Sequence, residues 1–350
     1  MSYTNGLDKP SDYFNTVLYT GNGTLGHAIT GVGHKPDFVW IKNRGSANGH
    51  VLHDVIRGVT KNIETSSAAA ENTLDPLSSF DSDGFTLNGT GGGINGNTET
   101  YASWNWKAGG TAVSNTDGSI TSTVSANTTS GFSIVSYTGN STSGATVGHG
   151  LSSALGMLIV KNRSEAKNWC VFHQSNGGTK NLSLNTTDAV EVNATRWNNT
   201  APTSSVFTLG NSTPVNNNGI TYIAYCFAEK QGYSKFGSYT GNGQDTPNGV
   251  FTYLGFTPAF ILIKATDINS WVMVDNKRPA DSNPVDSSLA ADSTATETTG
   301  DINTTFDFLS NGFRTNGNSG NNNSSGQEYI YMAFAENPFV SSSGVPATAR

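Results

Sequence analysis

Six histidines carry the most versatile chemistry in this chain, because imidazole can act as an acid, a base or a metal ligand. They are His27, His34, His50, His53, His149 and His173. A zinc site needs three or four ligands at recognisable spacings. No two of these histidines are four residues apart, as two ligands on one helix face would be, and the two cysteines are not at metal-binding spacing. We therefore predict no metal site and no cofactor.

Other motifs of catalytic or ligand-binding proteins are incomplete. Asp81-Ser-Asp-Gly84 resembles the start of a calcium loop, but the later ligands, ending in a glutamate, are missing. Gly91-Gly-Gly93 is not followed by the Lys and Ser or Thr of a phosphate loop, and no Gly-x-Ser-x-Gly nucleophile motif is present. No pair of carboxylates is marked as the acid and base of a glycosidase. We predict a non-enzymatic protein, with a polar turn at residues 81–84.

One tryptophan lies in a polar segment, where contact with a partner is a natural role for such a side chain. Trp197 follows Arg196 within Asn193-Ala-Thr-Arg-Trp-Asn-Asn-Thr200. Trp and Arg are enriched at interaction hot spots. Trp197 could equally cap the core of its own domain. Arg196 and Trp197 are therefore candidate contact residues for a ligand or partner, with this alternative open.

The elements that position these residues are predicted to be strands. Thr, Ser, Asn and Gly dominate the 350 residues, and short apolar runs alternate with turn residues, which is typical of an all-β protein. The formal net charge is −7, with 19 Lys and Arg, so the chain lacks the basic surface of a nucleic-acid-binding protein. No run of 18 apolar residues is present, so no membrane insertion is expected. Residues 1–13 do not resemble a secretory signal.

Five anchor motifs occur in the same order three times, so one module is repeated along the chain. The first anchor is Tyr19-Thr-Gly-Asn-Gly23, which recurs at Tyr137 and at Tyr239. The second is an apolar run that ends in Lys42, Lys161 or Lys264. The remaining three are the strands that contain the following residues: His50, Trp169 and Trp271; Phe85, Phe207 and Phe313; Trp104, Tyr225 and Met332.

Each module has about 100 residues and seven or eight candidate strands, so we predict three tandem antiparallel β-sandwiches of jelly-roll-like form. The period is too long for a solenoid, and we expect separate beads, each with its own core. The predicted parts are an N-terminal attachment segment at 1–13, repeats at 14–108, 131–230 and 233–338, an exposed linker at 109–130 and a C-terminal tail at 339–350.

The aligned copies separate core residues from candidate binding residues. Trp104 and Trp106 fall where the other copies have Tyr, Phe or Met, so we expect them in a core rather than stacked on a sugar. Cys170 and Cys226 lie in apolar, strand-like stretches, and we expect buried free thiols rather than a disulfide.

The anchors YTGNGT at 19–24, PDFVWIKNR at 36–44, SDGFTL at 82–87 and TYIAYCFAE at 221–229 resemble a repeated module of virion structural proteins of marine bacteriophages. The third copy departs from this pattern, because Ala265-Thr266 replaces Asn-Arg after the lysine. The resemblance implies a tail-fibre or virion-surface protein, assembled in the host cytoplasm as a homo-oligomer, with a trimer as the family-level expectation. It implies no catalytic residues.

We therefore expect a non-enzymatic virion surface protein that mediates host adsorption as a tail fibre or receptor-binding appendage, with other virion proteins and a host surface glycan as partners. The alternatives are a capsid decoration or head-fibre protein, a polysaccharide-degrading tailspike, and a cellular adhesin or lectin. Leu7, Pro10, Tyr13 and Phe14 are candidate virion-attachment residues. The loops that differ between the copies are expected to carry receptor binding; they are residues 62–80, 185–202 and 280–305.

Overall fold

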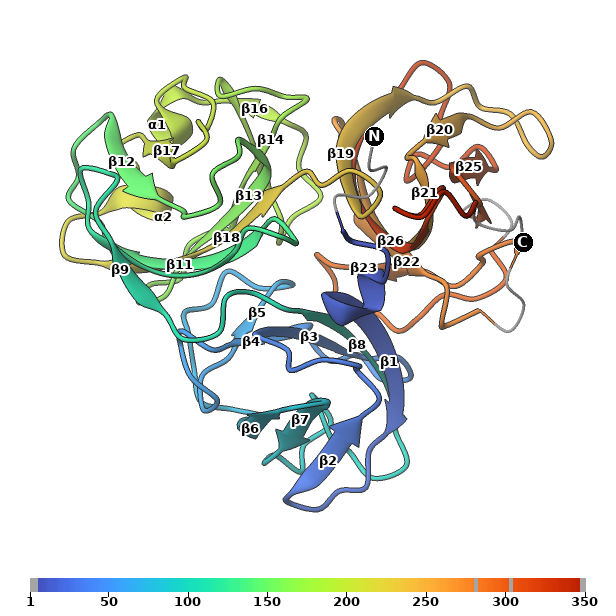
Figure 1. Ribbon diagram of the computed structural model, residues 1–350, viewed down its shortest axis with the longest axis horizontal. Coiled ribbons are helices and arrows are strands. Elements are labelled where there is room, and N and C mark those ends of the chain that lie inside the picture. Colours follow the sequence, from blue (N-terminus) through green and yellow to red (C-terminus); the bar gives the residue numbers. More distant parts are fainter. Residues whose placement is uncertain (1–5, 280–282, 302–304, 347–350) are drawn as a thin grey trace.

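Antiparallel strands make up nearly all of the regular structure in the computed structural model, which describes residues 6–279, 283–301 and 305–346 (Figure 1). The predicted all-β class is confirmed. The start of the predicted segment 1–13, parts of the predicted loop 280–305 and the end of the tail 339–350 lie outside the described residues. Among the described residues, no helix has the length and apolar character needed to cross a bilayer.

The first repeat contains a large sheet, β1-β8-β3-β4-β5, and a small sheet, β2-β7-β6. A hydrophobic cluster that includes Ile29, Val39, Phe85 and Tyr101 lies between the two sheets. The elements are η1 Pro10–Asp12, β1 Phe14–Thr20, β2 His27–Thr30, β3 Phe38–Asn43, β4 Val51–Asp54, β5 Ile63–Glu64, β6 Leu77–Asp81, β7 Gly84–Leu87 and β8 Thr100–Trp106.

The second repeat has a large sheet of eight strands, β16-β15-β14-β13-β18-β11-β10-β9, and a small sheet of two, β12-β17. Residues 109–130 were expected to form an exposed linker. They instead supply β9 and β10, because Val124 and its buried neighbours pair with β11. The elements are β9 Val113–Asn115, β10 Ser122–Asn127, β11 Phe132–Thr138, β12 Ala145–Gly148, β13 Leu155–Asn162, β14 Cys170–His173, β15 Lys180–Ser183, β16 Glu191–Val192, α1 Ala194–Trp197, β17 Val206–Leu209, α2 Thr213–Asn216 and β18 Thr221–Ala228.

The third repeat again pairs a large sheet, β19-β26-β21-β22-β23, with a small sheet, β20-β25-β24. The order of the five central strands is therefore the same in all three large sheets. The elements are β19 Ser234–Thr240, β20 Phe251–Tyr253, β21 Phe256–Ala265, β22 Trp271–Asp275, β23 Leu289–Ala290, β24 Thr305–Leu309, β25 Gly312–Asn316 and β26 Glu328–Pro338.

Each large sheet is apolar on both faces, which explains the unbroken apolar runs before the lysines. In β3, Val39 and Ile41 face the small sheet, whereas Phe38 and Trp40 face away from it into a second cluster. Strands β13 and β21 divide their side chains in the same way. Because successive side chains of a strand point to opposite faces, such a sheet must be covered on both sides.

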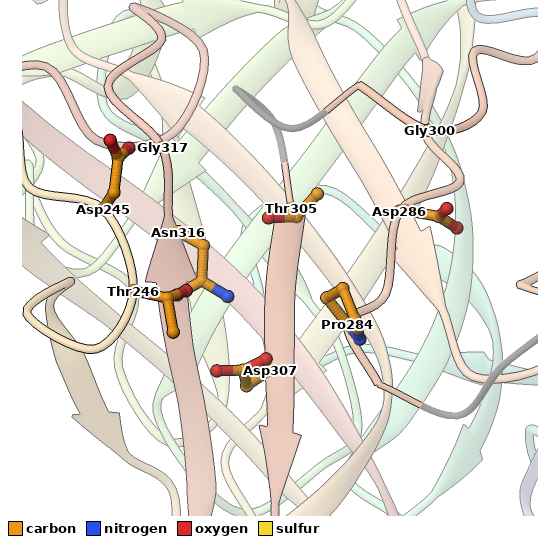
Figure 2. Close-up of a pocket in the computed structure, with 9 residues that line it drawn as sticks. All are labelled: Asp245, Thr246, Pro284, Asp286, Gly300, Thr305, Asp307, Asn316 and Gly317. Atoms are coloured by element: carbon orange, nitrogen blue, oxygen red, sulfur yellow. The ribbon is translucent and has the colours of Figure 1, made fainter.

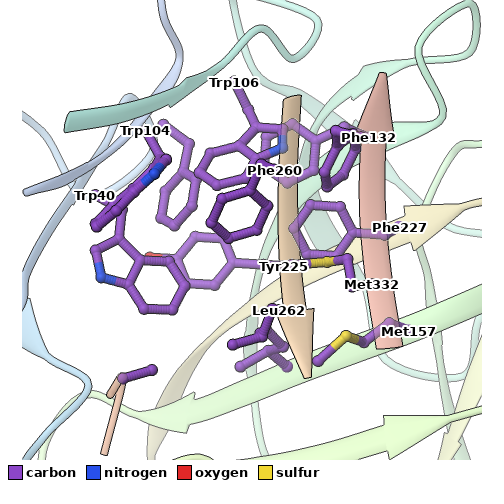
Figure 3. Close-up of a cluster of buried hydrophobic side chains, with 14 of the residues drawn as sticks. Trp40, Trp104, Trp106, Phe132, Met157, Tyr225, Phe227, Phe260, Leu262 and Met332 are labelled. Carbon is purple, nitrogen blue, oxygen red and sulfur yellow. The ribbon is translucent and has the colours of Figure 1, made fainter. Parts of the chain in front are cut away.

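The second cluster, called the central cluster here, joins all three repeats and corrects the expectation of separate beads. Figure 1 shows the repeats arranged around a common centre, and Figure 3 shows the side chains that meet there. Trp106 lies 5.8 Å from Phe260, and Phe227 lies 6.0 Å from Phe334, between ring centroids. Its aromatic members are Phe14, Phe38, Trp40, Trp104, Trp106, Phe132, Trp169, Tyr225, Phe227, Tyr233, Phe236, Phe260, Trp271 and Phe334.

The first anchor motif forms a structural turn in every repeat. A Cβ on its glycine would lie 2.3–2.4 Å from a backbone oxygen of the facing loop, so only glycine fits. The motif tyrosine stacks on a tyrosine of the closing strand and donates its hydroxyl to a loop carbonyl. The stacked pairs are Tyr19 with Tyr101 at 4.9 Å, Tyr137 with Tyr222 at 5.1 Å and Tyr239 with Tyr329 at 5.0 Å.

A buried lysine crosses each boundary between repeats. Its Nζ donates to two carbonyls of its own repeat and to one of the preceding repeat in a cyclic order. Burial lowers the pKa of all three ammonium groups to about 8. The contacts between repeats are Lys42 with Thr294 at 3.2 Å, Lys161 with Ala68 at 3.1 Å and Lys264 with Thr187 at 3.3 Å. The three repeats therefore contact one another with pseudo-threefold symmetry.

A buried charged network accompanies the lysine between the first and second repeats. Asp54 accepts hydrogen bonds from Arg57 at 2.5 Å and from the Tyr225 hydroxyl at 2.8 Å. Glu71 pairs with Arg163 of the second repeat at 3.0 Å and lies 3.6 Å from Arg57. Carboxylates and guanidinium groups thus alternate across the boundary.

The same network recurs between the third and first repeats. Asp275 accepts from Arg278 at 2.6 Å and from the Trp104 indole at 3.0 Å. Glu297 pairs with Arg278 at 3.0 Å and with Arg44 at 2.7 Å. Trp104 is therefore a core residue, as predicted, and also a hydrogen-bond donor to the neighbouring repeat.

The boundary between the second and third repeats has none of these charged groups. The Nε2 of His173 lies 3.0 Å from the Tyr331 carbonyl. Val190 keeps the backbone hydrogen bond of 2.9 Å, to Thr266, that Glu71 and Glu297 make at the other two boundaries, but no ion pair accompanies it. A buried charge without its partner is strongly destabilising. This explains why the carboxylates and the guanidinium groups are all replaced together at this boundary. The five residues at the equivalent positions are His173, Asn176, Val190, Thr266 and Met332. The departure at Ala265-Thr266 thus belongs to a coordinated change.

We expect the charged network to be essential once its partners are in place. Replacing Asp275 by alanine leaves Arg278 buried without its nearest carboxylate, and should lower the free energy of unfolding by about 3 kcal/mol or more. The matched control is Asp12→Ala, which removes an exposed pair with Lys9 and should cost less than about 1 kcal/mol. Urea denaturation measures both. Equal, small effects would contradict the proposed role of the network.

Acidification should destabilise the fold through buried imidazoles. Burial lowers the pKa of His173 from 6.5 to about 4 and that of His53 to about 3. The unfolded chain binds protons below pH 6.5 that the folded chain does not accept. Stability is therefore fully present above pH 6.5 and falls as the pH decreases toward 4, by about 1.4 kcal/mol per pH unit for each imidazole.

The test compares the protein with its His173→Gln variant by urea denaturation between pH 8 and pH 4.5. The difference at pH 8 gives the cost of the lost contacts, because both side chains are neutral there. The free energy of unfolding of the variant should then fall less steeply with decreasing pH, by about the slope that one titrating imidazole contributes. If the unfolding free energies of the two proteins change with pH in parallel, the pKa of His173 does not differ between the folded and unfolded states.

Candidate binding face on the third repeat

Trp197 is buried in the second repeat, so it caps a core. It is 1% exposed and packs edge-on against Phe172 at 6.4 Å. Its helix α1 begins at an Asn193 cap and lies against β17, where the small sheet has only two strands. Arg196 pairs with Glu191 at 3.2 Å. The burial of Trp197 corrects the interpretation of this residue as a surface contact. The alternative, that Trp197 caps the core of its own domain, describes its position.

The candidate attachment residues largely pack against other parts of the same chain. Leu7 and Phe14 are each 1% exposed in the central cluster, and Phe14 stacks on Phe334 at 5.1 Å. Pro10 is buried in η1, and Tyr13 packs edge-on against Tyr233 at 6.2 Å. The apolar pattern of this segment is explained by its packing against the central cluster, which corrects the picture of a free attachment peptide.

The three loops expected to bind a receptor contain the contacts between repeats. Ala68 and Glu71 lie in the loop 62–80, Thr187 in the loop 185–202, and Thr294 and Glu297 in the described part of 280–305. Their differences from copy to copy follow from the different boundaries that they form. These loops therefore have a structural role at the boundaries, and receptor binding by their exposed side chains stays a prediction.

The outer face of the small sheet β20-β25-β24 exposes two aromatic side chains. Phe251 and Tyr253 are 48% and 54% exposed, while Thr252 between them is buried. Strand β20 is an edge strand, so this alternation presents both rings to solvent on one face. The ammonium of Lys235 lies 5.2 Å from the Tyr253 ring centroid. The exposed rings of Phe251 and Tyr253, two residues apart on one strand, together are called the aromatic platform here.

The internal repeat provides a control for this platform. Thr252 lies opposite Phe313, as Ile29 lies opposite Phe85 and Val147 opposite Phe207. This register fixes the equivalents of the two aromatic residues, and all of them are small. They are Ala28 and Thr30 in the first repeat, and Thr146 and Gly148 in the second. The aromatic pair is therefore specific to the third repeat and is not required by the fold.

An ion pair continues the outer face from the platform. Phe251 lies directly opposite Arg314, and Arg314 lies opposite Asp307 on the next strand. The guanidinium donates to Asp307 at 2.5 Å and to the Pro247 carbonyl at 3.1 Å. Arg314 is thus held flat across the sheet, with its charge paired, between the platform and the strand that carries Asp307.

A cavity of about 440 Å³ lies at the end of the same face (Figure 2). Figure 2 shows Asn316 on β25 and Thr305 and Asp307 on β24, with Asp245 and Thr246 to one side and Pro284 and Asp286 to the other. Asn316 is 4% exposed, and its Oδ1 has no hydrogen-bond partner among the described residues. The cavity has a size typical of small-molecule sites.

A smaller cavity of about 200 Å³ borders the other side of the platform. It is lined in part by Tyr253, Lys235 and Glu229. Tyr253 therefore stands between this cavity and the rest of the outer face. The platform, the ion pair and the larger cavity together are called the outer face of the third repeat below.

The side chains of this face can make apolar contacts and hydrogen bonds. The rings offer apolar contact area, and the carboxylates and the Asn316 amide oxygen accept hydrogen bonds. In the part of the chain that the structure describes, no three His, Cys, Asp or Glu side chains gather as metal ligands.

The polar turn predicted at residues 81–84 holds Asp83 against the backbone N–H groups of Gly31 and Gly33 at 3.0 and 2.6 Å. Cys170 and Cys226 are buried and unbonded.

Comparison with known families places residues 9–338 in a single family, described as a domain of unknown function, DUF7483. Because this match spans nearly the whole chain, the protein belongs to that family. A search of curated proteins gave no match. A search of solved structures also gave no match.

Sequence reasoning missed the outer face, although a signal was present. Phe251 and Tyr253 alternate with Thr252 in a repeat whose other copies have small residues there. Aligning the strand that precedes the apolar run would have marked them. The cavity had no comparable signal, since Asp245, Asp286 and Asn316 come from three segments that only the fold brings together.

The aromatic platform should contribute little to stability. The double variant Phe251→Ala, Tyr253→Ala removes exposed side chains, so each change should alter the free energy of unfolding by about 0.5 kcal/mol or less. Phe313→Ala is the control, because this ring is fully buried in the same sheet and should cost about 3–5 kcal/mol. Thermal and urea denaturation measure both. A large loss in the double variant would mean that the platform is structural.

Proposed function

We propose that this protein is a non-enzymatic phage virion surface protein that binds the host surface, as a tail fibre or receptor-binding appendage. The observation that carries the proposal is the exposed pair Phe251 and Tyr253, which the fold does not require and which the other repeats lack. An exposed aromatic pair beside a cavity with aspartates in its lining is a recognition feature. The anchor motifs, which resemble a virion module, support the biological setting.

The rest of the chain serves as a scaffold in this proposal. We propose three fused β-sandwiches of jelly-roll-like form, each with its own cluster between a large and a small sheet. The central cluster and the lysine contacts join them. Function is carried by a site on a fold rather than by the fold itself, and the third repeat carries that site.

A capsid decoration or head-fibre role is the second candidate, and the pseudo-threefold symmetry favours it. The boundaries that a homotrimer of single modules would form are filled within one chain. We propose that one chain of 36.8 kDa can occupy a threefold position on a particle. A homotrimer would have three times the mass of one chain, and light scattering of the purified protein distinguishes a monomer from a homotrimer.

Adsorption competition tests the proposed function. Purified chain in excess should occupy host receptors and reduce phage adsorption, whereas the Phe251→Ala, Tyr253→Ala variant should compete at least tenfold less well. Cryo-EM of the particle should place the chain at the tail. Density on the capsid lattice together with no competition would favour decoration. Hydrolysis of host polysaccharide by the chain would favour a tailspike, and absence from the particle would favour an adhesin.

A further inference from the structure

We infer that the outer face of the third repeat binds a glycan with neutral or amino sugars, and discriminates against acidic polysaccharides. The inference deepens the proposed function, on which its biological setting rests. It stands on the juxtaposition of three features on one sheet face: the aromatic platform, the paired Arg314 and a cavity lined by hydrogen-bond acceptors.

The aromatic platform suits the apolar face of a sugar ring. Phe251 and Tyr253 are two residues apart on one strand, so their Cα atoms are about 6.6–6.8 Å apart. Both rings are about half exposed, and the buried Thr252 anchors the strand between them. Rigid aromatic side chains lose little conformational entropy on binding. Sugar rings can therefore stack on this platform without rearrangement of the sheet.

The cavity requires donors from its ligand. Asp245, Asp286 and Asp307 line the cavity, and only Asp307 has a basic partner within ion-pair distance among the described residues. The unpartnered Oδ1 of Asn316 is also an acceptor, and a buried acceptor without a donor is costly. Sugar hydroxyl and amino groups supply such donors.

The balance of charge excludes acidic glycans. Arg314 is neutralised by Asp307, whereas Lys235, whose ammonium lies over the Tyr253 ring, keeps its positive charge beside the platform and is not part of the cavity lining. The remaining carboxylates of the cavity leave it negative, and the chain as a whole has a net charge of −7. Sulfate or carboxylate groups of a polysaccharide would therefore be repelled, whereas a protonated amino sugar would be attracted.

A peptide added to the free edge of β20 is the rival occupant. Edge strands can accept a further strand through backbone hydrogen bonds. The glycan is favoured because the distinctive groups are side chains of the sheet face, extending from Phe251 across Arg314 to the cavity, rather than backbone groups of the edge.

The test is a glycan array of neutral, amino and acidic oligosaccharides, followed by calorimetry with the best neutral or amino-sugar hexasaccharide and with a heparin hexasaccharide. The full chain should bind the former and not heparin. Phe251→Ala, Tyr253→Ala should weaken binding at least tenfold. The control Val192→Ala, Ile268→Ala removes side chains that are 79% and 69% exposed and lie outside this face, and should bind as the parent chain does.

Three results would overturn the inference: no binding across the array, preference for heparin, or binding unchanged in the aromatic double variant. If the array fails while the chain still competes for adsorption, the proposed function stands and the ligand is a protein. If adsorption competition fails while glycan binding depends on Phe251 and Tyr253, the glycan site stands and the virion role is wrong.

Discussion

The outward face of each large sheet is apolar, and water has to be excluded from it. An isolated repeat would expose Trp40, Tyr225 or Met332 together with their neighbours, an area of the kind that marks an interface. Packing three such faces around one centre buries all of them at once. The central cluster is therefore the interaction on which the arrangement of the repeats depends. It also explains why η1 and Phe14 pack inward, since they cover part of the same apolar surface.

Polar contacts at the boundaries determine how the repeats are ordered. Hydrophobic burial is not directional, but each lysine must reach specific carbonyls of the preceding repeat. The charged networks at two boundaries add groups that have no counterpart at the third. A misplaced repeat would leave Glu71 without Arg163, or Glu297 without Arg44. Buried ion pairs often contribute more to specificity than to stability, and we interpret these networks as fixing the order of the repeats.

These internal contacts use part of the surface on which binding was expected. The variable loops hold neighbouring repeats, Trp197 completes a core, and the N-terminal residues cover the central cluster. The outer face of the third repeat is different, because its two aromatic side chains are about half exposed where the other repeats have small residues. Two copies have small residues at these positions, and we propose that the aromatic side chains of the third serve ligand binding.

The sequence by itself determined the all-β class, the three copies and their strands, because turn residues, alternation and repeated motifs are local signals. It also marked Trp104, Trp106 and the two cysteines as buried. The tertiary structure decided the rest. The meeting of Trp106 with Phe260, the cyclic contacts of Lys42, Lys161 and Lys264, and the cavity at Asn316 join residues far apart in the chain. An apolar run indicates that a face is covered, but only packing in three dimensions decides which surface covers it.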